Sequence, residues 1–391
     1  MLLSSPYSIP TFQKDGNMFY LTYTTVFIFS ALIISIFKKS NNYDSKKFDV
    51  YTWIILAMIV LILLQPAIFY IYDVKLFGHI LDSYLAILSI YVLAKKYGYL
   101  FTEDFILRAI AIFSICNSLF SFAQFITGKP LSPTSPYESI IYNIGYGELK
   151  RVSGLLGSNN GAGNLGAIFF TPLLYFLIKR PSFKRSIPFI LNIIFTILTF
   201  TRIGYVSIAI QLIIFLFYRN RNKIKKIKKT KIVVCIIFII IIGYALINID
   251  TTMNALFEKR GSTENSRWEQ FERAKEVFVE NKLLGIGYGN YIQYAVQIFL
   301  QSDIIIHSQY INTLVESGSI GFILFTLINI IPIIILLKRF KLNRWIPISI
   351  FIGNFIVINF NPNQYYFMNI FIYFYLIFNL GLCKSNTEKV I

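Results

Sequence analysis

The chain alternates between long apolar runs and short polar segments along nearly its whole length. Most apolar runs reach roughly 17–25 residues, which lets an α-helix cross the hydrocarbon core of a bilayer. The period-two alternation of a membrane β-barrel does not occur in the sequence, and lipid leaves only helices and closed barrels as spanning structures. The pattern predicts an all-α, polytopic helical membrane protein with about eleven spans, a count of ten or twelve remaining open. The expected spans lie near residues 18–37, 50–71, 77–94, 105–127, 160–178, 186–200, 203–218, 232–248, 317–337, 345–360 and 364–382.

Basic residues cluster at alternate ends of these spans. Clusters follow the first, third, fifth, seventh and ninth spans, and the longest runs from Arg219 to Lys231. If successive spans alternate in direction, every cluster lies on one side, which the positive-inside bias makes cytoplasmic. The N-terminus is then outside and the C-terminus inside. Two longer segments, residues 128–158 and 249–307, become extracytoplasmic loops.

Composition agrees with this class and limits the other choices. Hydrophobic residues make up 55% of the chain and charged residues 14%, whereas soluble domains carry about 25% charged residues. We therefore expect a single transmembrane domain over residues 1–391, with membrane lipids as its surroundings. The net charge of +18 could suggest nucleic acid, but the long basic run has no interleaved aromatics, so we interpret it as a topology anchor that attracts acidic headgroups. The first residues lack the features of a cleavable signal peptide.

The two outer loops differ in their expected structure. The loop 128–158 is rich in Pro, Ser, Gly and Tyr, which is typical of irregular structure. In the loop 249–307, Ser266 followed by Glu269 forms a capping-box signal for the start of a helix. Apolar residues then recur at helical spacing, at Trp268, Phe271, Ala274 and Phe278. We predict an amphipathic helix over residues 267–280, on the membrane surface or on the bundle.

Arginines on the outer face are the first candidates for chemistry. Arg202 lies in a very short turn between two apolar spans, where a charge is costly and is a functional hypothesis by default; snorkelling to headgroups is the alternative. Arg151 and Asn159 belong to a Gly- and Asn-rich segment that leads into a span, which suits an anion site at a helix start. Arg267 is expected in the first turn of its helix, where the dipole disfavours a cation. Pairing with a neighbouring glutamate is the alternative for Arg267, and Arg260 and Arg273 are weaker candidates.

Converging arginines favour a phosphate ligand. Guanidinium groups match phosphate oxygens bidentately, and several at a membrane surface suit a lipid-linked phosphate or diphosphate. The sequence contains no Asp-x-Asp pair and no His/Glu cluster with metal-ligand spacing. We therefore expect a site without a metal or other cofactor, in which arginines neutralise the charge that Mg²⁺ neutralises elsewhere.

His307 is the candidate general base. It is one of two histidines and stands where the long loop re-enters an apolar segment, with Tyr310 on the same helical face. Nearby guanidinium groups favour a neutral imidazole, which can accept a proton from a sugar hydroxyl, an effect worth roughly 10²–10⁴ in rate. A plain interfacial histidine is the alternative. The other histidine, His79, is interpreted as structural.

These residues resemble the O-antigen polymerase and O-antigen ligase superfamily of bacterial membrane glycosyltransferases. The resembling segments cover about a fifth of the chain and are Arg151–Gly163, Thr199–Ile208 and Ser266–Gly321. The resemblance implies a GT-C-like fold, an undecaprenyl-diphosphate-linked oligosaccharide as substrate, and a site facing the periplasm from the bacterial inner membrane. It also implies that Arg202 and Arg267 hold the diphosphate, that Arg151 lines the same cleft, and that His307 acts as base. The family often has Asn after the histidine, where this chain has Ser308.

The sequence thus predicts a polymerase of O-antigen or another surface polysaccharide. Whether a chain-length regulator protein binds to it is left open, and nucleic acid is not expected as a partner. A ligase that transfers the glycan to the lipid A–core of lipopolysaccharide is the close alternative. A flippase for the same lipid is an alternative from another class, and a polysaccharide sensor is a third. Transporters place charge and broken helices near the midplane in repeat-related halves, whereas here polar groups gather at one face.

Overall fold

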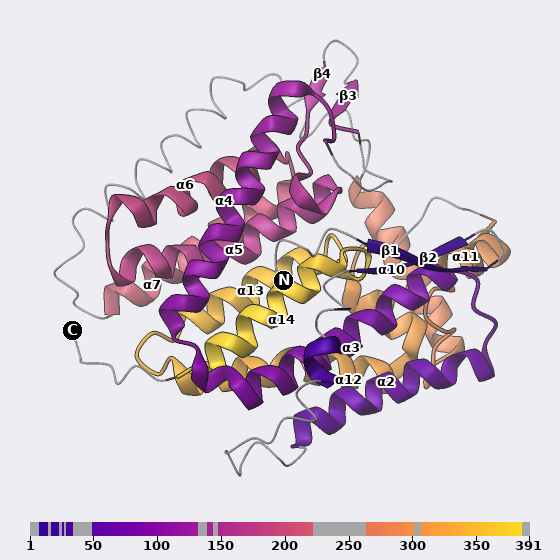
Figure 1. Cartoon of the computed structure of the whole chain (residues 1–391). Coiled ribbons are helices and arrows are strands. Elements are labelled where there is room, and N and C mark those ends of the chain that lie inside the picture. Colours follow the sequence, from indigo (N-terminus) through magenta and orange to yellow (C-terminus); the bar gives the residue numbers. More distant parts are fainter. Residues whose placement is uncertain are drawn as a thin grey trace. The chain divides into compact units, whose positions relative to one another are not determined.

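A computed structural model describes residues 8–14, 17–22, 26, 29–33, 49–131, 139–143, 148–221, 263–300 and 306–384 (Figure 1). Within this part the protein is helical, with two short β-hairpins. Five helices are long and apolar enough to cross a membrane: α2 (Val50–Ile68), α3 (Val74–Tyr97, continued by a 3₁₀ turn, η3, Gly98–Leu100), α4 (Glu103–Thr127), α5 (Asn159–Lys179) and α12 (Gln309–Arg339). The protein is therefore a polytopic membrane protein, as its hydropathy predicted.

Four further helices coincide with predicted spans but are shorter or more polar. They are α6 (Phe183–Leu198), α7 (Arg202–Arg221), α13 (Trp345–Ile358) and α14 (Phe367–Leu382). Nine of the expected spans thus correspond to helices, while the span near residues 232–248 lies outside the described residues. The count of eleven spans stays a prediction.

The N-terminal segment differs from the prediction. Strand β1 (Ser8–Lys14) pairs antiparallel with β2 (Asn17–Thr22), so the expected span near residues 18–37 begins as a strand and not as a helix. The dipeptide Asp15-Gly16 between the two strands is a strong hairpin signal that hydropathy alone does not weigh. Within the rest of that expected span, only Val26 and residues 29–33 are described, and they are helical.

A second hairpin lies in the loop 128–158, which was predicted to be irregular. Strand β3 (Ile141–Asn143) pairs with β4 (Glu148–Lys150), and a 3₁₀ turn, η4 (Gly154–Leu156), follows. The sequence between the strands contains two glycines, which suit a turn. The prediction of irregular structure is wrong for these residues, because a short hairpin carries too few residues for a clear apolar pattern.

The chain divides into two compact units, each made of separate stretches of sequence. The first contains residues 1–106, 267–342 and 357–391, and the second contains residues 107–266 and 343–356. In the first unit α3 packs against α2 and α14, and α12 packs against α2 and α14. Three aromatic rings meet where these helices join, since Tyr51 contacts Tyr91 and Phe378 edge to face.

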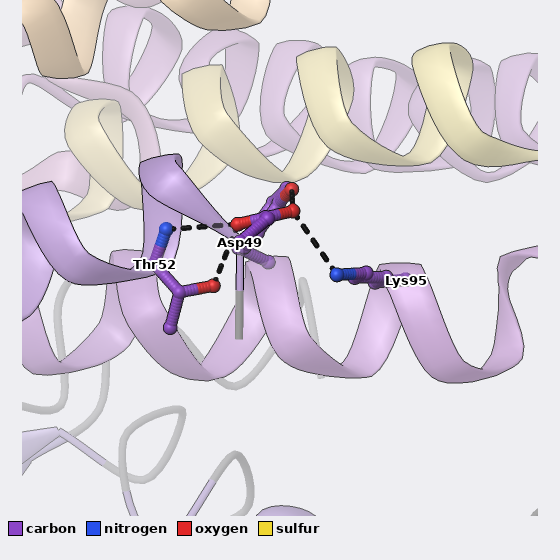
Figure 2. Close-up of polar contacts among 4 residues, drawn as sticks. Asp49, Thr52 and Lys95 are labelled. Atoms are coloured by element: carbon purple, nitrogen blue, oxygen red, sulfur yellow. Dashed lines mark hydrogen bonds and ion pairs between the residues drawn. The ribbon is translucent and has the colours of Figure 1, made fainter. Parts of the chain in front are cut away.

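A polar contact ties the start of α2 to the end of α3. Asp49 caps α2 by accepting hydrogen bonds from the backbone N–H and the hydroxyl of Thr52, at 3.0 and 2.9 Å. Figure 2 shows that the same carboxylate also reaches Lys95, whose Nζ lies 3.0 Å away, and the Tyr91 hydroxyl donates to it as well. Burial acts to raise the pKa of Asp49, but these hydrogen bonds outweigh it and hold the pKa below its ordinary value.

The second unit is centred on α5, which is buried along almost its whole length. It packs against α6 and α7, beside which it lies in Figure 1. Polar side chains join these helices in the apolar interior: the Thr171 hydroxyl lies 2.6 Å from Gln211 Oε1 and 2.9 Å from Ser349 Oγ. Helices in membranes associate through such hydrogen bonds and through small residues, because lipid gives no hydrophobic drive between them.

Candidate functional site

The candidate site residues fall in both units. Arg151, Asn159 and Arg202 belong to the second unit, and a group on the first unit contains Arg267, Arg273, His307 and Tyr310. Arg260 lies outside the described residues. Each group is built by the helices of its own unit.

Arg151 is a buried arginine that joins two turns of the second unit. It is 6% exposed. Its Nε donates to the carbonyl of Thr199 at 3.1 Å, and its Nη2 donates to Asn160 Oδ1 at 3.3 Å. Both acceptors are neutral oxygens, so these two hydrogen bonds orient the guanidinium group without cancelling its charge.

Two buried amides on α4 hold the backbone that follows Arg151. Gln124 Oε1 accepts hydrogen bonds from the backbone N–H groups of Ser153 and Gly154, at 3.2 and 2.9 Å. Asn117 Oδ1 accepts from the N–H of Leu155 at 2.9 Å. Sequence reasoning missed both amides, because a single amide within an apolar span does not show that it will be fully buried or which backbone groups it will satisfy.

Arg202 begins α7, next to the start of α5. The hydroxyl of Thr201 donates to the carbonyl of Asn159, the first residue of α5, at 2.9 Å. The two helices approach closely there, since a Cβ added to Gly204 would lie 2.9 Å from the Gly163 carbonyl oxygen. Because Arg151 bonds to Thr199 on one side and to Asn160 on the other, all three predicted residues of this unit come together around two helix starts.

This arrangement favours an anion. The N-terminal end of a helix carries a partial positive charge and backbone N–H groups without intrahelical partners. Ser158 caps α5 through the N–H of Gly161 at 3.5 Å. Two such helix ends with two guanidinium groups beside them suit phosphate oxygens.

His307 stands in the first unit, just before α12. Its side chain is exposed, and Ser308 caps the helix by accepting from the N–H of Ile311 at 3.3 Å. Gln270, on helix α10 (Thr263–Glu280), contacts His307 twice: its Oε1 accepts from the backbone N–H of His307 and also lies beside the ring Nδ1, each at 3.2 Å. Sequence reasoning missed Gln270, which is 8% exposed and therefore an unusually buried amide on a surface loop helix.

Arg267 lies one turn before Gln270 on α10. The helix begins at Thr263, so Ser266 is inside it and does not cap it, and the prediction that Arg267 occupies the first turn is wrong. The sequence from Thr263 to Ser266 is polar and helix-compatible, and its single glutamate, Glu264, suits the first turn of a helix that starts earlier. The guanidinium group lies over the Phe360 ring at 4.6 Å from its centroid.

The turn that contains Phe360 is tied to the start of α12. The hydroxyl of Ser308 donates to Asn359 Oδ1 at 2.7 Å, and Gln309 Oε1 accepts from the backbone N–H of Asn363 at 3.1 Å. These contacts bring His307 and Arg267 to one end of the first unit, joined by Gln270 and by this turn.

The other two candidates of this unit make packing contacts. Arg273 forms an ion pair with Glu269 one turn earlier and lies over the Phe299 ring of α11 (Tyr291–Phe299) at 5.2 Å. Tyr310 packs edge to face with Phe325, with ring centroids 4.9 Å apart. The short helix α11 was not predicted.

The glycine-rich segment from Gly285 to Asn290 docks on a break in α12. Gly318 has φ 64° and ψ −168° inside that helix, which leaves nearby carbonyl and N–H groups without intrahelical partners. The N–H of Ile286 donates to Val315 O at 3.2 Å, and the N–H of Gly287 donates to Glu316 O at 2.9 Å. Gly285 itself has φ 67°, and a Cβ there would lie 2.5 Å from the Glu316 backbone. The segment therefore supplies hydrogen-bond partners to backbone groups of α12 at its break, in the part of the helix that follows His307.

A buried carboxylate and two amides support this docking. Glu316 is 1% exposed; it accepts from the N–H of Tyr291 at 3.2 Å and from Asn312 Nδ2 at 2.8 Å. Gln65 of α2 accepts from the N–H of Tyr288 at 2.9 Å, and Asn290 Nδ2 donates to Tyr70 O at 2.8 Å.

Burial raises the pKa of Tyr291 to about 12, so its hydroxyl stays protonated at neutral pH.

Comparison with known proteins adds one finding. Residues 187–326 match a family model described as O-antigen ligase. The matched segment includes Arg202, Arg267 and His307, whereas Arg151 and Asn159 precede it. No curated protein matches this chain.

Proposed function

We propose that this chain, which carries a domain of the O-antigen ligase and polymerase family over residues 187–326, is a surface-polysaccharide polymerase. It transfers the growing glycan from undecaprenyl diphosphate to a lipid-linked repeat unit at the periplasmic face of the bacterial inner membrane. The observation that carries the transfer chemistry common to polymerase and ligase is the family match. It covers the base candidate His307 and four of the five outer arginines, all but Arg151. The GT-C-like fold and the eleven spans are part of the same proposal.

The proposed chemistry is a single group transfer. A hydroxyl of the acceptor sugar attacks the anomeric carbon of the donor glycan, and His307 takes the hydroxyl proton. The bond from that carbon to the diphosphate breaks, and undecaprenyl diphosphate leaves with the electron pair. Arg202 and Arg267, with Arg151, stabilise the negative charge that grows on the diphosphate, as pre-placed cations do. The reaction needs no nucleotide sugar, no metal and no other cofactor.

The geometry of each group supports its role. His307 is exposed and held at its backbone and ring by Gln270, so a substrate hydroxyl can approach an oriented imidazole. Arg202 begins a helix next to the start of another, and buried Arg151 bonds to the turn that precedes it. Binding at a helix start by guanidinium groups is typical of phosphate sites.

The ligase is the second candidate, and one observation favours it: the matching family model is described as O-antigen ligase. The two reactions share the donor and the proposed base and differ only in the acceptor. Supplying the acceptors separately distinguishes them, since a ligase forms no product until lipid A–core is present.

Replacing His307 by Ala in cells that make the polysaccharide tests the enzyme against the flippase. We expect the variant to be present in the membrane at normal level and polymer to be lost, while single repeat units still reach the periplasmic face. General-base catalysis is worth roughly 10²–10⁴ in rate, so residual polymer should be at or below the limit of detection on a gel. Loss of translocation of the repeat unit would instead make the protein a flippase.

A further inference from the structure

We infer that Gln270 is a positioning residue that fixes the tautomer of His307, so that Nε2 is the nitrogen that takes the substrate proton. The inference rests on the proposed function for its catalytic consequence, but its structural content, the tautomer, is independent of any activity. It starts from the two contacts that a single oxygen, Gln270 Oε1, makes with one residue.

The orientation of the Gln270 amide follows from the backbone. The N–H of His307 lies 3.2 Å from Gln270 Oε1. A backbone N–H is a donor at every pH, so the atom that faces it must be an acceptor. A flipped amide would place an NH₂ group against this N–H, donor against donor. The need for an acceptor therefore decides that the amide oxygen of Gln270, and not its nitrogen, faces the N–H of His307.

The tautomer of the ring follows from the amide. The same Oε1 lies 3.2 Å from His307 Nδ1. An amide oxygen can only accept, so Nδ1 must carry the hydrogen for this contact to be a hydrogen bond. In a neutral imidazole only one nitrogen carries hydrogen, which leaves the lone pair on Nε2. Without such an acceptor, an imidazole in water favours the opposite tautomer, in which Nε2 carries the hydrogen and cannot act as a base.

Packing holds the Gln270 side chain where the contact requires it. Gln270, Ala274 and Val277 lie at helical spacing on the buried face of α10, and they are 8%, 2% and 1% exposed. Ala274 and Val277 pack in one cluster with Ile306, the neighbour of His307, and with Val315 of α12. This packing holds the backbone of α10 next to Ile306, and the burial of Gln270 limits the positions that its amide can take.

Nitrogen NMR of the purified full-length protein with ¹⁵N-histidine tests the tautomer directly. The chain has only two histidines, so the signals missing from the His307→Ala variant belong to His307. We expect Nδ1 to be protonated and Nε2 unprotonated in wild type, and the Nε2–H form to appear in Gln270→Met, which keeps the side-chain length and removes the acceptor. A protonated Nε2 in neutral wild-type protein, or an unchanged tautomer in Gln270→Met, would overturn the inference.

Kinetics test the positioning role. With lipid-linked repeat units as substrate, Gln270→Met should lower kcat severalfold with little change in KM, because the larger part of the base is then in the wrong tautomer. Gln270→Glu keeps the acceptor and should retain activity, while its carboxylate favours the protonated ring and moves the acidic limb of the pH–rate profile to higher pH. Gln293→Met, the same change at an exposed glutamine of α11, is the matched control. An unmoved acidic limb in Gln270→Glu overturns the role.

Failure of the two proposals is distinguishable. If wild-type protein forms no polymer but shows the expected tautomer, the proposed function fails and the assignment of Gln270 stands. If Gln270→Met does not fold, the wild-type spectrum and the Gln270→Glu profile still decide the matter. If polymer forms and Gln270→Met is as active as Gln293→Met, the positioning role is wrong.

Discussion

At the residue scale, the candidate arginines make different kinds of contact. Arg273 is paired with Glu269, so much of its charge is already compensated. Arg151 is buried and bonds to a carbonyl and an amide oxygen, which orient it and leave its charge in place. Arg267 lies over an aromatic ring, a contact worth about 0.5–1 kcal/mol at exposed sites. We therefore expect Arg151, Arg202 and Arg267 to bind the diphosphate. Arg273 is the weakest candidate because of its ion pair.

Replacing Arg202 tests this expectation. Arg202→Ala should lower kcat/KM by about 10–100-fold, since hydrogen bonds to charged groups are worth roughly 1.5–3 kcal/mol. The kcat/KM of Arg202→Lys should lie between those of wild type and Arg202→Ala, because lysine keeps the positive charge but lacks the planar guanidinium group. Arg180→Ala, an exposed arginine of the same unit, is the control and should match wild type. Wild-type kinetics for Arg202→Ala, measured with purified lipid-linked repeat units, would remove Arg202 from the site.

The sequence was sufficient to select the arginines and His307 as candidates. It was not sufficient to identify the residues that hydrogen-bond to them or to the backbone beside them. A charge in a very short turn or a lone histidine at a span boundary is visible in the sequence. Gln124 and Gln270 are not, because an amide becomes meaningful only when the fold shows which backbone groups it satisfies. Glu316 lies in the segment Ser266–Gly321 that resembles the family, but its role depends on the break at Gly318, which the sequence does not show.

At the element scale, the glycine-rich segment and the broken helix α12 form one structural feature. The break at Gly318 exposes backbone groups, and the segment from Lys282 to Gly287 satisfies them: Ser319 N donates to Lys282 O at 2.8 Å and Gly287 N to Glu316 O at 2.9 Å. The sequence shows the glycines but not that the two stretches pair with each other. We conclude that the glycines serve the docking of the loop on α12, which places the His307 end of the helix.

Replacing Gly318 by Ala should therefore destabilise the protein. Its φ of 64° is unfavourable for a residue with a Cβ, and the added atom would lie 2.2 Å from the Leu283 carbonyl oxygen. Strain of this kind costs about 1–3 kcal/mol before the clash is counted. Thermal unfolding in detergent should show a clear fall in Tm, whereas Gly381→Ala, whose nearest contact is a side-chain carbon at 3.2 Å, should stay close to wild type. Equal Tm values for both variants would show that the break tolerates a side chain.

The contact of Asp49 with α3 predicts a pH dependence of stability. The folded-state pKa of Asp49 lies below its ordinary value, because the hydrogen bonds outweigh the cost of burial. Such a group stabilises the fold above its unfolded-state pKa and loses that contribution as pH falls through the folded-state pKa. The Tm of wild type should fall as pH is lowered below about 4. Asp49→Asn should have a lower Tm than wild type at neutral pH, and the difference between the two Tm values should become smaller in acid. A gap that stays constant with pH would contradict this.

At the scale of the whole molecule, hydropathy predicted more of the fold than any motif did. Apolar length alone located nine helices, since a span must be long and apolar whatever it packs against. It failed at the two hairpins, where turn residues decide the structure. The sidedness of the chain, with His307 and the arginines outside, follows from the charge bias of the loops and remains a prediction.

The most direct measurement is polymerisation by purified protein in liposomes, with undecaprenyl-diphosphate-linked repeat units as the only glycan. We expect a ladder of polymer for wild type without added metal or nucleotide, and none for a folded His307→Ala variant. If wild-type protein forms product only after lipid A–core is added, it is a ligase. If His307→Ala builds the same ladder as wild type, the proposed role of the histidine is contradicted.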